Sequence, residues 1–78
     1  MTLNEIRDGE RAVIENFEID DDLRQRFFSF GLNPGKKIKK LKSTLKGSTI
    51  EIQIDRSCVI LRKNEAEKIR VSRANENA

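Results

Sequence analysis

The segment Thr49–Asp55, TIEIQID, limits the possible folds of this chain more than any other stretch. Isoleucines occupy every second position from Ile50 to Ile54, and the residues between them are polar. Successive side chains of a β-strand point to opposite faces, so this alternation predicts a strand with one buried and one solvated face. Such a strand is stable only in a sheet whose apolar face covers a core.

The chain has 78 residues, enough for one small domain with a thin core. Hydrophobic residues make up 36% and charged residues 37%, but the apolar residues fall in patterned runs, which argues against disorder. We predict a loop over Thr44–Ser48, a two-residue connection at Arg56-Ser57, and further strands at Arg11–Phe17, Lys36–Ser43, Cys58–Arg62 and around Ile69 and Val71. The apolar residues of Lys36–Ser43 do not share parity, which a β-bulge would reconcile.

A short helix is predicted between the first two strands. Asp22 is expected to be its N-cap, with Gln25 at capping-box spacing, and Asp20 and Asp21 add negative charge at the positive end of the helix dipole. Gly31 is placed to take the left-handed conformation that ends a helix. One apolar stripe, at i, i+4 and i+7, is formed by Leu23, Phe27 and Phe30.

Two shorter turns have capping-box spacing as well. Thr2 and Glu5 bracket a turn at the N-terminus, and Asn64 with Glu67 brackets a single helical turn before the last strand. These elements predict a mostly β fold, a small SH3-like barrel of about five strands with one short α-helix inserted after the first strand. The domain is expected to span residues 1–71, and residues 72–78, which have no apolar pattern, are expected to form a disordered tail.

Charge is distributed unevenly along the chain. The net charge is −4 over residues 1–30 and +7 over residues 31–63. A basic segment of this density suggests an anionic partner. The alternative is that the lysines only keep the outer face of a strand soluble and protect its edge from aggregation.

Three stretches, in this order, resemble one known family. They are LNEIRDGERAVI (Leu3–Ile14), LRQRFFSFGLNPGKKI (Leu23–Ile38) and LRKNEAEKIRV (Leu61–Val71). The family is that of ferrous iron transport protein A, FeoA, whose SH3-like domain is also found at the end of iron-dependent repressors. The chain departs from the family pattern at Lys40, where an apolar residue is common, in the loop LKGST, and at Ser57, where glycine is usual.

The resemblance implies a cytoplasmic accessory protein of ferrous iron uptake, which docks to the cytosolic, GTPase-like domain of a membrane ferrous iron permease. It implies an association with transition metals at the level of the family, and it brings no catalytic residues and no cofactor. The direction in which such a protein would modulate transport, and its oligomeric state, are left open by the sequence.

The residues themselves offer little chemistry. The chain has no histidine and one cysteine, so Ser-His and Cys-His catalysis are excluded and no enzyme activity is expected. Cys58 is interpreted as a small buried hydrophobe. The run Asp20–Asp22 is explained by helix capping, and we expect no metal site of the chain's own. No apolar run approaches the length of a membrane span, and the N-terminus does not resemble a signal peptide, so no membrane insertion is expected.

Two interpretations of the basic segment follow. In the first, Phe28 lies off the apolar stripe of the helix and, if exposed, contributes an apolar spot beside cations that suits an acidic partner surface. The partner-binding residues predicted on this basis are Phe28, Leu32, Lys36, Lys37, Lys39, Lys40 and Lys42. In the second, a basic β-barrel binds RNA or single-stranded DNA, although the chain has no Tyr or Trp and three of its four phenylalanines fall in the core helix with the acidic cap. Stable nucleic-acid binding is therefore not expected.

Overall fold

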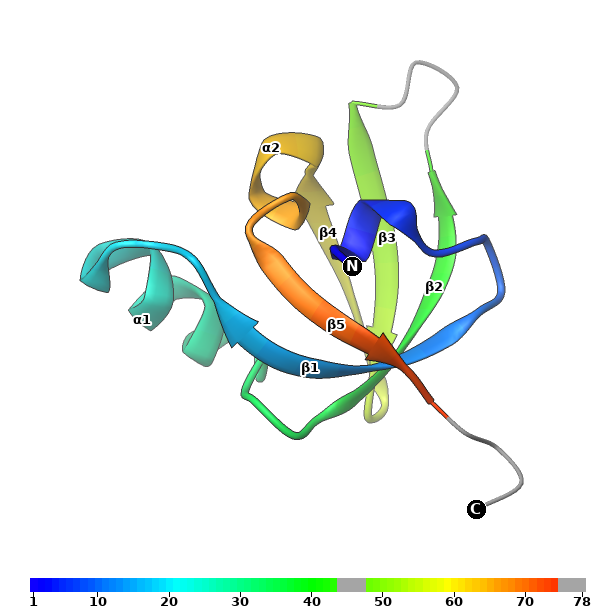
Figure 1. Ribbon diagram of the computed structural model, residues 1–78, viewed down its shortest axis with the longest axis horizontal. Coiled ribbons are helices and arrows are strands. Elements are labelled where there is room, and N and C mark those ends of the chain that lie inside the picture. Colours follow the sequence, from blue (N-terminus) through cyan, green and yellow to red (C-terminus); the bar gives the residue numbers. More distant parts are fainter. Residues whose placement is uncertain (44–47, 75–78) are drawn as a thin grey trace.

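The computed structural model describes residues 1–43 and 48–74. Five antiparallel strands form one sheet in the order β4-β3-β2-β1-β5, and Figure 1 shows how strongly this sheet curves. In chain order the elements are η1 (Leu3–Glu5), β1 (Arg11–Phe17), α1 (Asp21–Ser29), β2 (Lys37–Ser43), β3 (Thr49–Ile54), β4 (Ser57–Arg62), α2 (Lys63–Ala66) and β5 (Ile69–Arg73). The predicted mostly β fold, with a helix after the first strand, is confirmed.

Strand β1 has the predicted bounds and lies between β2 and β5. The register with β5 shifts between Ile14 and Asn16, which marks a bulge. The extra residue changes the parity of the strand. Phe17 is therefore buried together with Ala12 and Ile14, although in a regular strand it would point the other way.

Strand β2 contains the predicted irregularity. Its register with β3 shifts between Lys40 and Lys42, so the extra residue is Leu41. Up to that point the strand alternates regularly, with Ile38 and Lys40 buried and Lys37 exposed. The bulge thus lets one short strand follow the curvature of the sheet.

The connection between β3 and β4 differs from the prediction by one residue. Ile54 pairs with Ser57, so the two connecting residues are Asp55 and Arg56 rather than Arg56 and Ser57. Asp55 has a φ of 55°, a left-handed conformation that Asp tolerates better than most residues. The predicted loop Thr44–Ser48 lies, except for Ser48, outside the described residues.

Helix α1 begins two residues earlier than predicted. Asp20, not Asp22, is its N-cap, because the Leu23 N–H donates to the Asp20 carboxylate at 3.0 Å. Asp21 and Asp22 lie in the first turn, where negative charge is favourable.

The C-terminus of α1 is as predicted. Gly31 has a φ of 85°, its N–H donates to the Phe28 carbonyl, and the Leu32 N–H donates to the Phe27 carbonyl, each at 3.0 Å. This pair of hydrogen bonds is a Schellman motif. It turns the chain sharply and directs Leu32 into the core, where its side chain is fully buried.

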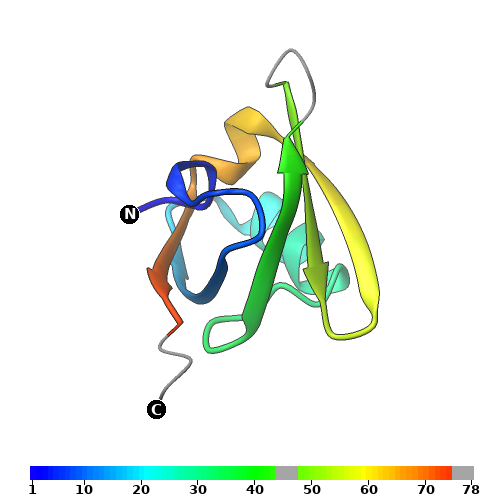
Figure 2. The ribbon, with the colours of Figure 1, turned by 90° about the vertical axis from the view of Figure 1, so that its right-hand side faces the viewer.

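Among the described residues, fifteen buried apolar side chains form the core, and they come from all five strands, from the helices and from the segments between them. Phe27 is the residue by which α1 enters this core; it is fully buried, and its ring meets that of Phe17 edge-on with centroids 5.2 Å apart. Leu23 and Phe30 are only partly buried against the core. Figure 1 shows α1 beyond the end of β1, and Figure 2, turned by 90°, shows the same helix behind the curved sheet, so α1 covers one end of it.

The short helix α2 is capped differently from the prediction. Arg62 precedes it, and the Arg62 N–H donates to the Glu65 carboxylate at 3.0 Å, whereas Asn64 lies inside the helix. The buried Glu65 carboxylate also forms a salt bridge with the guanidinium of Arg26 in α1, at a distance of 3.0 Å. This pair joins the two helices across the chain.

The two ends of the domain are also defined. The capping box of Thr2 and Glu5 is present as predicted, and the Thr2 N–H donates to the Glu5 carboxylate at 2.9 Å. These hydrogen bonds lower the pKa of Glu5 from its ordinary value near 4.5. At the other end, Ser72 and Arg73 belong to β5, so the sheet continues two residues beyond position 71, and residues 75–78 lie outside the described residues.

Candidate docking site

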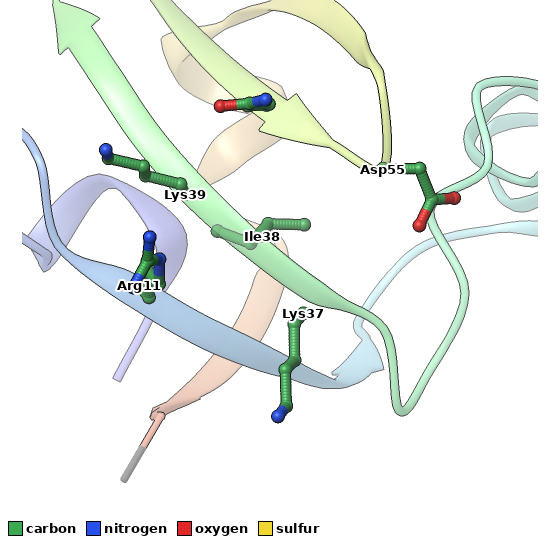
Figure 3. Close-up of a pocket in the computed structure, with 6 residues that line it drawn as sticks. Arg11, Lys37, Ile38, Lys39 and Asp55 are labelled. Carbon is green, nitrogen blue, oxygen red and sulfur yellow. The ribbon is translucent and has the colours of Figure 1, made fainter. Parts of the chain in front are cut away.

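The outer face of the sheet carries a row of polar side chains across three strands. Lys39 of β2 lies opposite Arg11 of β1 on one side and opposite Gln53 of β3 on the other. Here the sheet has a shallow depression of about 280 Å³, lined by Arg11, Lys37, Ile38, Lys39, Gln53 and Asp55. Figure 3 shows Arg11 and Lys39 beside each other on neighbouring strands, with Lys37 further along β2.

The hydrogen bonds between β1 and β2 show how close Arg11 and Lys39 are. The Lys40 N–H donates to the Glu10 carbonyl and the Ile14 N–H donates to the Lys36 carbonyl, each at 2.9 Å. Hydrogen-bonded and non-hydrogen-bonded pairs alternate along an antiparallel ladder. Arg11 and Lys39 therefore form a non-hydrogen-bonded pair, the kind in which facing side chains come closest.

The lysines of this segment differ in their partners. Lys36 forms a salt bridge with Asp55 at 2.9 Å, and Lys42 lies 4.0 Å from Glu51. Within residues 1–43 and 48–74, Lys37 and Lys39 form no salt bridge. Lys37 and Lys39 therefore carry positive charge that no carboxylate in the described part of the chain neutralises.

Lys40 is not on the outer face, contrary to the prediction. It is only 5% exposed, and its ammonium group donates to the Ile6 carbonyl at 2.8 Å with Asp8 at 3.8 Å. Lys40 has the same parity as Ile38, so the strand turns it toward the core. Its hydrogen bond links the segment before β1 to β2, and its buried ammonium group is not accessible to a partner.

Leu32 also differs from the expectation. It is fully buried, and therefore it is part of the core and not of an exposed patch. Phe28, by contrast, is 42% exposed, with its ring 6.1 Å from that of Phe17. The helix thus presents one phenylalanine to solvent and holds the preceding one inside.

Strand β4 contains exposed residues that the sequence analysis missed or misplaced. Cys58 is exposed, not buried as predicted, and Ile60 is 66% exposed. β4 is an end strand of the sheet, and both residues occupy positions that point away from the core. Cys58 pairs with Gln53 and Ile60 pairs with Glu51, two outward-facing residues of β3. The alternation of β3 could have indicated that both residues are exposed, but the continuous apolar run of β4 suggested burial instead.

Acidic residues do not gather into a ligand cluster in the described part of the chain. No group of three or more Cys, Asp or Glu side chains lies together there in an arrangement that could hold a metal ion. In the same residues, no helix has both the length and the apolar character needed to cross a membrane.

The topology and the site together define a small SH3-like domain with a cationic outer face. The family model described as FeoA domain matches residues 1–73, and the chain belongs to this family. A protein of Campylobacter jejuni named as an Fe(2+) transport protein A is 47% identical over 72 residues, which cover 92% of this chain and 97% of that relative. A protein of the same name from Helicobacter pylori strain J99 is 41% identical over 68 residues, covering 86% of this chain and 87% of the relative.

Solved structures agree with this assignment. The solution structure of the FeoA protein from Chlorobium tepidum superimposes with a TM-score of 0.90 at 32% identity, covering 96% of this chain and 71% of that one. A manganese-dependent transcriptional repressor matches with a TM-score of 0.86 at 23% identity, over 95% of this chain and 41% of the repressor. The second likeness concerns the fold alone. The predicted family and the predicted SH3-like fold are both confirmed.

Proposed function

We propose that this protein is a non-enzymatic accessory factor of ferrous iron uptake, which acts in the cytoplasm by docking to the cytosolic domain of a membrane ferrous iron permease. The observation that carries the proposal is membership of the FeoA domain family along residues 1–73, together with relatives named for Fe(2+) transport. The adaptor role follows from the kind of surface that the domain offers. It has an exposed aromatic ring and a cationic face, and both suit protein recognition.

The non-enzymatic part of the proposal rests on the residues. The chain has no histidine, so its single thiol, the exposed Cys58 of the end strand β4, cannot be activated by an imidazole of this chain. Its contribution to iron uptake would then be to bind a partner and change the partner's behaviour.

A capture experiment tests the proposal. The purified domain is immobilised and incubated with detergent extracts of cells that express the permease, either complete or without its cytosolic domain. We expect capture of the complete permease and loss of capture when the cytosolic domain is removed. Equal recovery of both forms, or of neither, would contradict the proposed docking.

Nucleic acid is the competing ligand, since the charges of Lys37 and Lys39 are not neutralised by neighbouring carboxylates. The stacking platform that single strands need is missing beside them, because Phe28 lies on α1 and not on the cationic strands. A gel-shift titration separates the two functions. Binding to an oligonucleotide should be weak and should vanish at physiological salt; tight binding at that salt would favour the nucleic-acid function.

A further inference from the structure

We propose that the outer face of β1 and β2 binds an extended acidic segment of the partner protein, with carboxylates at alternate positions, through Lys37, Lys39 and Arg11. This inference rests on the proposed docking function and names the site and the chemistry of the bound segment. It follows from the charges, the strand register and the spacing of the three cations.

The charges single out this face. The neighbouring lysines have partners within the chain. Lys36 forms a salt bridge with Asp55, and Lys42 lies near Glu51. Lys40 is buried, with the Ile6 carbonyl and Asp8 beside its ammonium group. Lys37 and Lys39 form no such pair within the described residues.

The register places like charges against each other. Arg11 and Lys39 face each other across a non-hydrogen-bonded pair, so a carboxylate bound at this point would accept hydrogen bonds from a guanidinium and an ammonium at once. Gln53, on the other side of Lys39, adds an uncharged donor and acceptor for a backbone or amide group.

The spacing of the two lysines matches that of carboxylates on an extended segment. Lys37 and Lys39 are two residues apart on one face of a strand, so their Cα atoms are about 6.6 Å apart. Carboxylates at positions i and i+2 of an extended peptide have the same separation. A segment of the type Glu-x-Glu, lying along β2, would therefore meet both ammonium groups without bending.

Ile38 and the ends of the depression complete the site. Ile38 lies between the two lysines in sequence and is 2% exposed, so its side chain packs into the core beneath the depression. Asp55 lies at one border, already bound to Lys36, and would repel a further acidic residue there. The site thus favours a short run of carboxylates over a long polyanion.

The test uses the complete chain and synthetic peptide probes. The probe is a fluorescent peptide containing Ser-Glu-Ser-Glu-Ser, the matched control peptide has Gln in place of both Glu, and binding is followed by polarisation at low salt. We expect binding of the acidic peptide, no binding of the Gln peptide, and about tenfold weaker binding in the double variant Lys37→Gln/Lys39→Gln, since two exposed charge pairs are lost.

A charge-matched variant provides the control. Lys63→Gln/Lys68→Gln removes the same number of charges at exposed positions in and after α2, and it should bind the acidic peptide as the unmodified chain does. An equal loss in this control would overturn the proposal, because attraction would then depend on net charge and not on the site. Tighter binding of inorganic phosphate or of an oligonucleotide than of the acidic peptide at this face would overturn it as well.

Self-association must be measured alongside. If the unmodified chain forms dimers that Lys37→Gln/Lys39→Gln abolishes, the occupant is a second copy of the chain, and the proposal is wrong. Sedimentation of both variants at several protein concentrations decides this.

The permease distinguishes this inference from the function on which it rests. If the Lys37→Gln/Lys39→Gln variant captures the permease as well as the unmodified chain does, the site is wrong while the docking function stands. If the unmodified chain binds the acidic peptide at this site but never captures the permease, the docking function fails while the binding site stands. Loss of both peptide and permease binding in this variant alone would support the two proposals together.

Discussion

Helix α1 and strand β2 each place two neighbouring residues of one type in opposite environments. In α1, Phe27 is fully buried and Phe28 is 42% exposed. In β2, Lys40 is 5% exposed, whereas Lys39 faces the outer depression. The comparison shows that position in the element, and not residue type, decides whether a side chain supports the fold or is available to a partner.

The two elements achieve this separation differently. Consecutive residues of a helix are rotated by about 100°, so only a narrow stripe of α1 reaches the core. Consecutive residues of a strand point to opposite faces, so β2 divides its lysines strictly until the bulge at Leu41. An error of one residue in assigning side chains to faces therefore matters more in β2, because it moves every buried side chain to the surface and every exposed one to the core.

The largest difference is expected between the two phenylalanines. Phe27→Ala should lower the free energy of unfolding by about 3–5 kcal/mol, because it removes the side chain that anchors α1 in the core. Phe28→Ala should cost less than about 1 kcal/mol, because its ring is half exposed. Urea denaturation of both variants measures the contrast, and similar costs would mean that α1 is not anchored by Phe27.

A smaller difference is expected between the two lysines. Lys40→Met should lower the free energy of unfolding by about 1–3 kcal/mol, since the buried Ile6 carbonyl would lose its donor. Lys39→Met, which changes the same atoms on the outer face, should stay within about 0.5 kcal/mol of the unmodified chain. A Lys40→Met variant as stable as Lys39→Met would show that the Lys40 hydrogen bond contributes nothing to folding.

Charge reversal at Lys39 on the outer face should raise the stability of the fold, whereas the substitutions above lower it. Lys39→Glu places a carboxylate opposite Arg11 and should raise the free energy of unfolding by about 0.2–1 kcal/mol. The same variant should bind the acidic peptide less well. A fall in stability would indicate that Lys39 has a structural role like that of Lys40, and the contrast between the two faces would be lost.

The smallest effect is expected in acid, at the exposed N-terminal turn. The hydrogen bonds from Thr2 lower the pKa of Glu5 below 4.5 in the folded protein, so its ionised form stabilises the fold above pH 4.5. This contribution is lost as the pH falls through the lowered pKa. Stability should therefore decline more steeply with acid in the unmodified chain than in Glu5→Gln; parallel curves would contradict this.

Much of the fold could be predicted because the responsible signals are local. The alternation of Ile50 to Ile54, the bounds of β1 and the left-handed Gly31 each follow from a few neighbouring residues. The errors also have local causes. Three consecutive aspartates can each cap a helix, and only the geometry of the entering chain selects Asp20.

The site could be predicted only in part. The basic segment was found from its charge, and Lys37 and Lys39 do lie on the outer face. Leu32 and Lys40 were assigned to that surface although both are buried. Arg11 and Gln53 were missed, because they come from other strands and meet Lys39 only through the register of the sheet.

The order of residues along the chain was sufficient to determine which segments become strands and helices and to place an excess of positive charge on one of them, because hydrophobic periodicity and capping act over one or two turns. Tertiary structure alone decided which lysine is buried against the Ile6 carbonyl and which strands bring their cations together. These outcomes depend on bulges and strand register, and both arise from packing between segments that are distant in sequence.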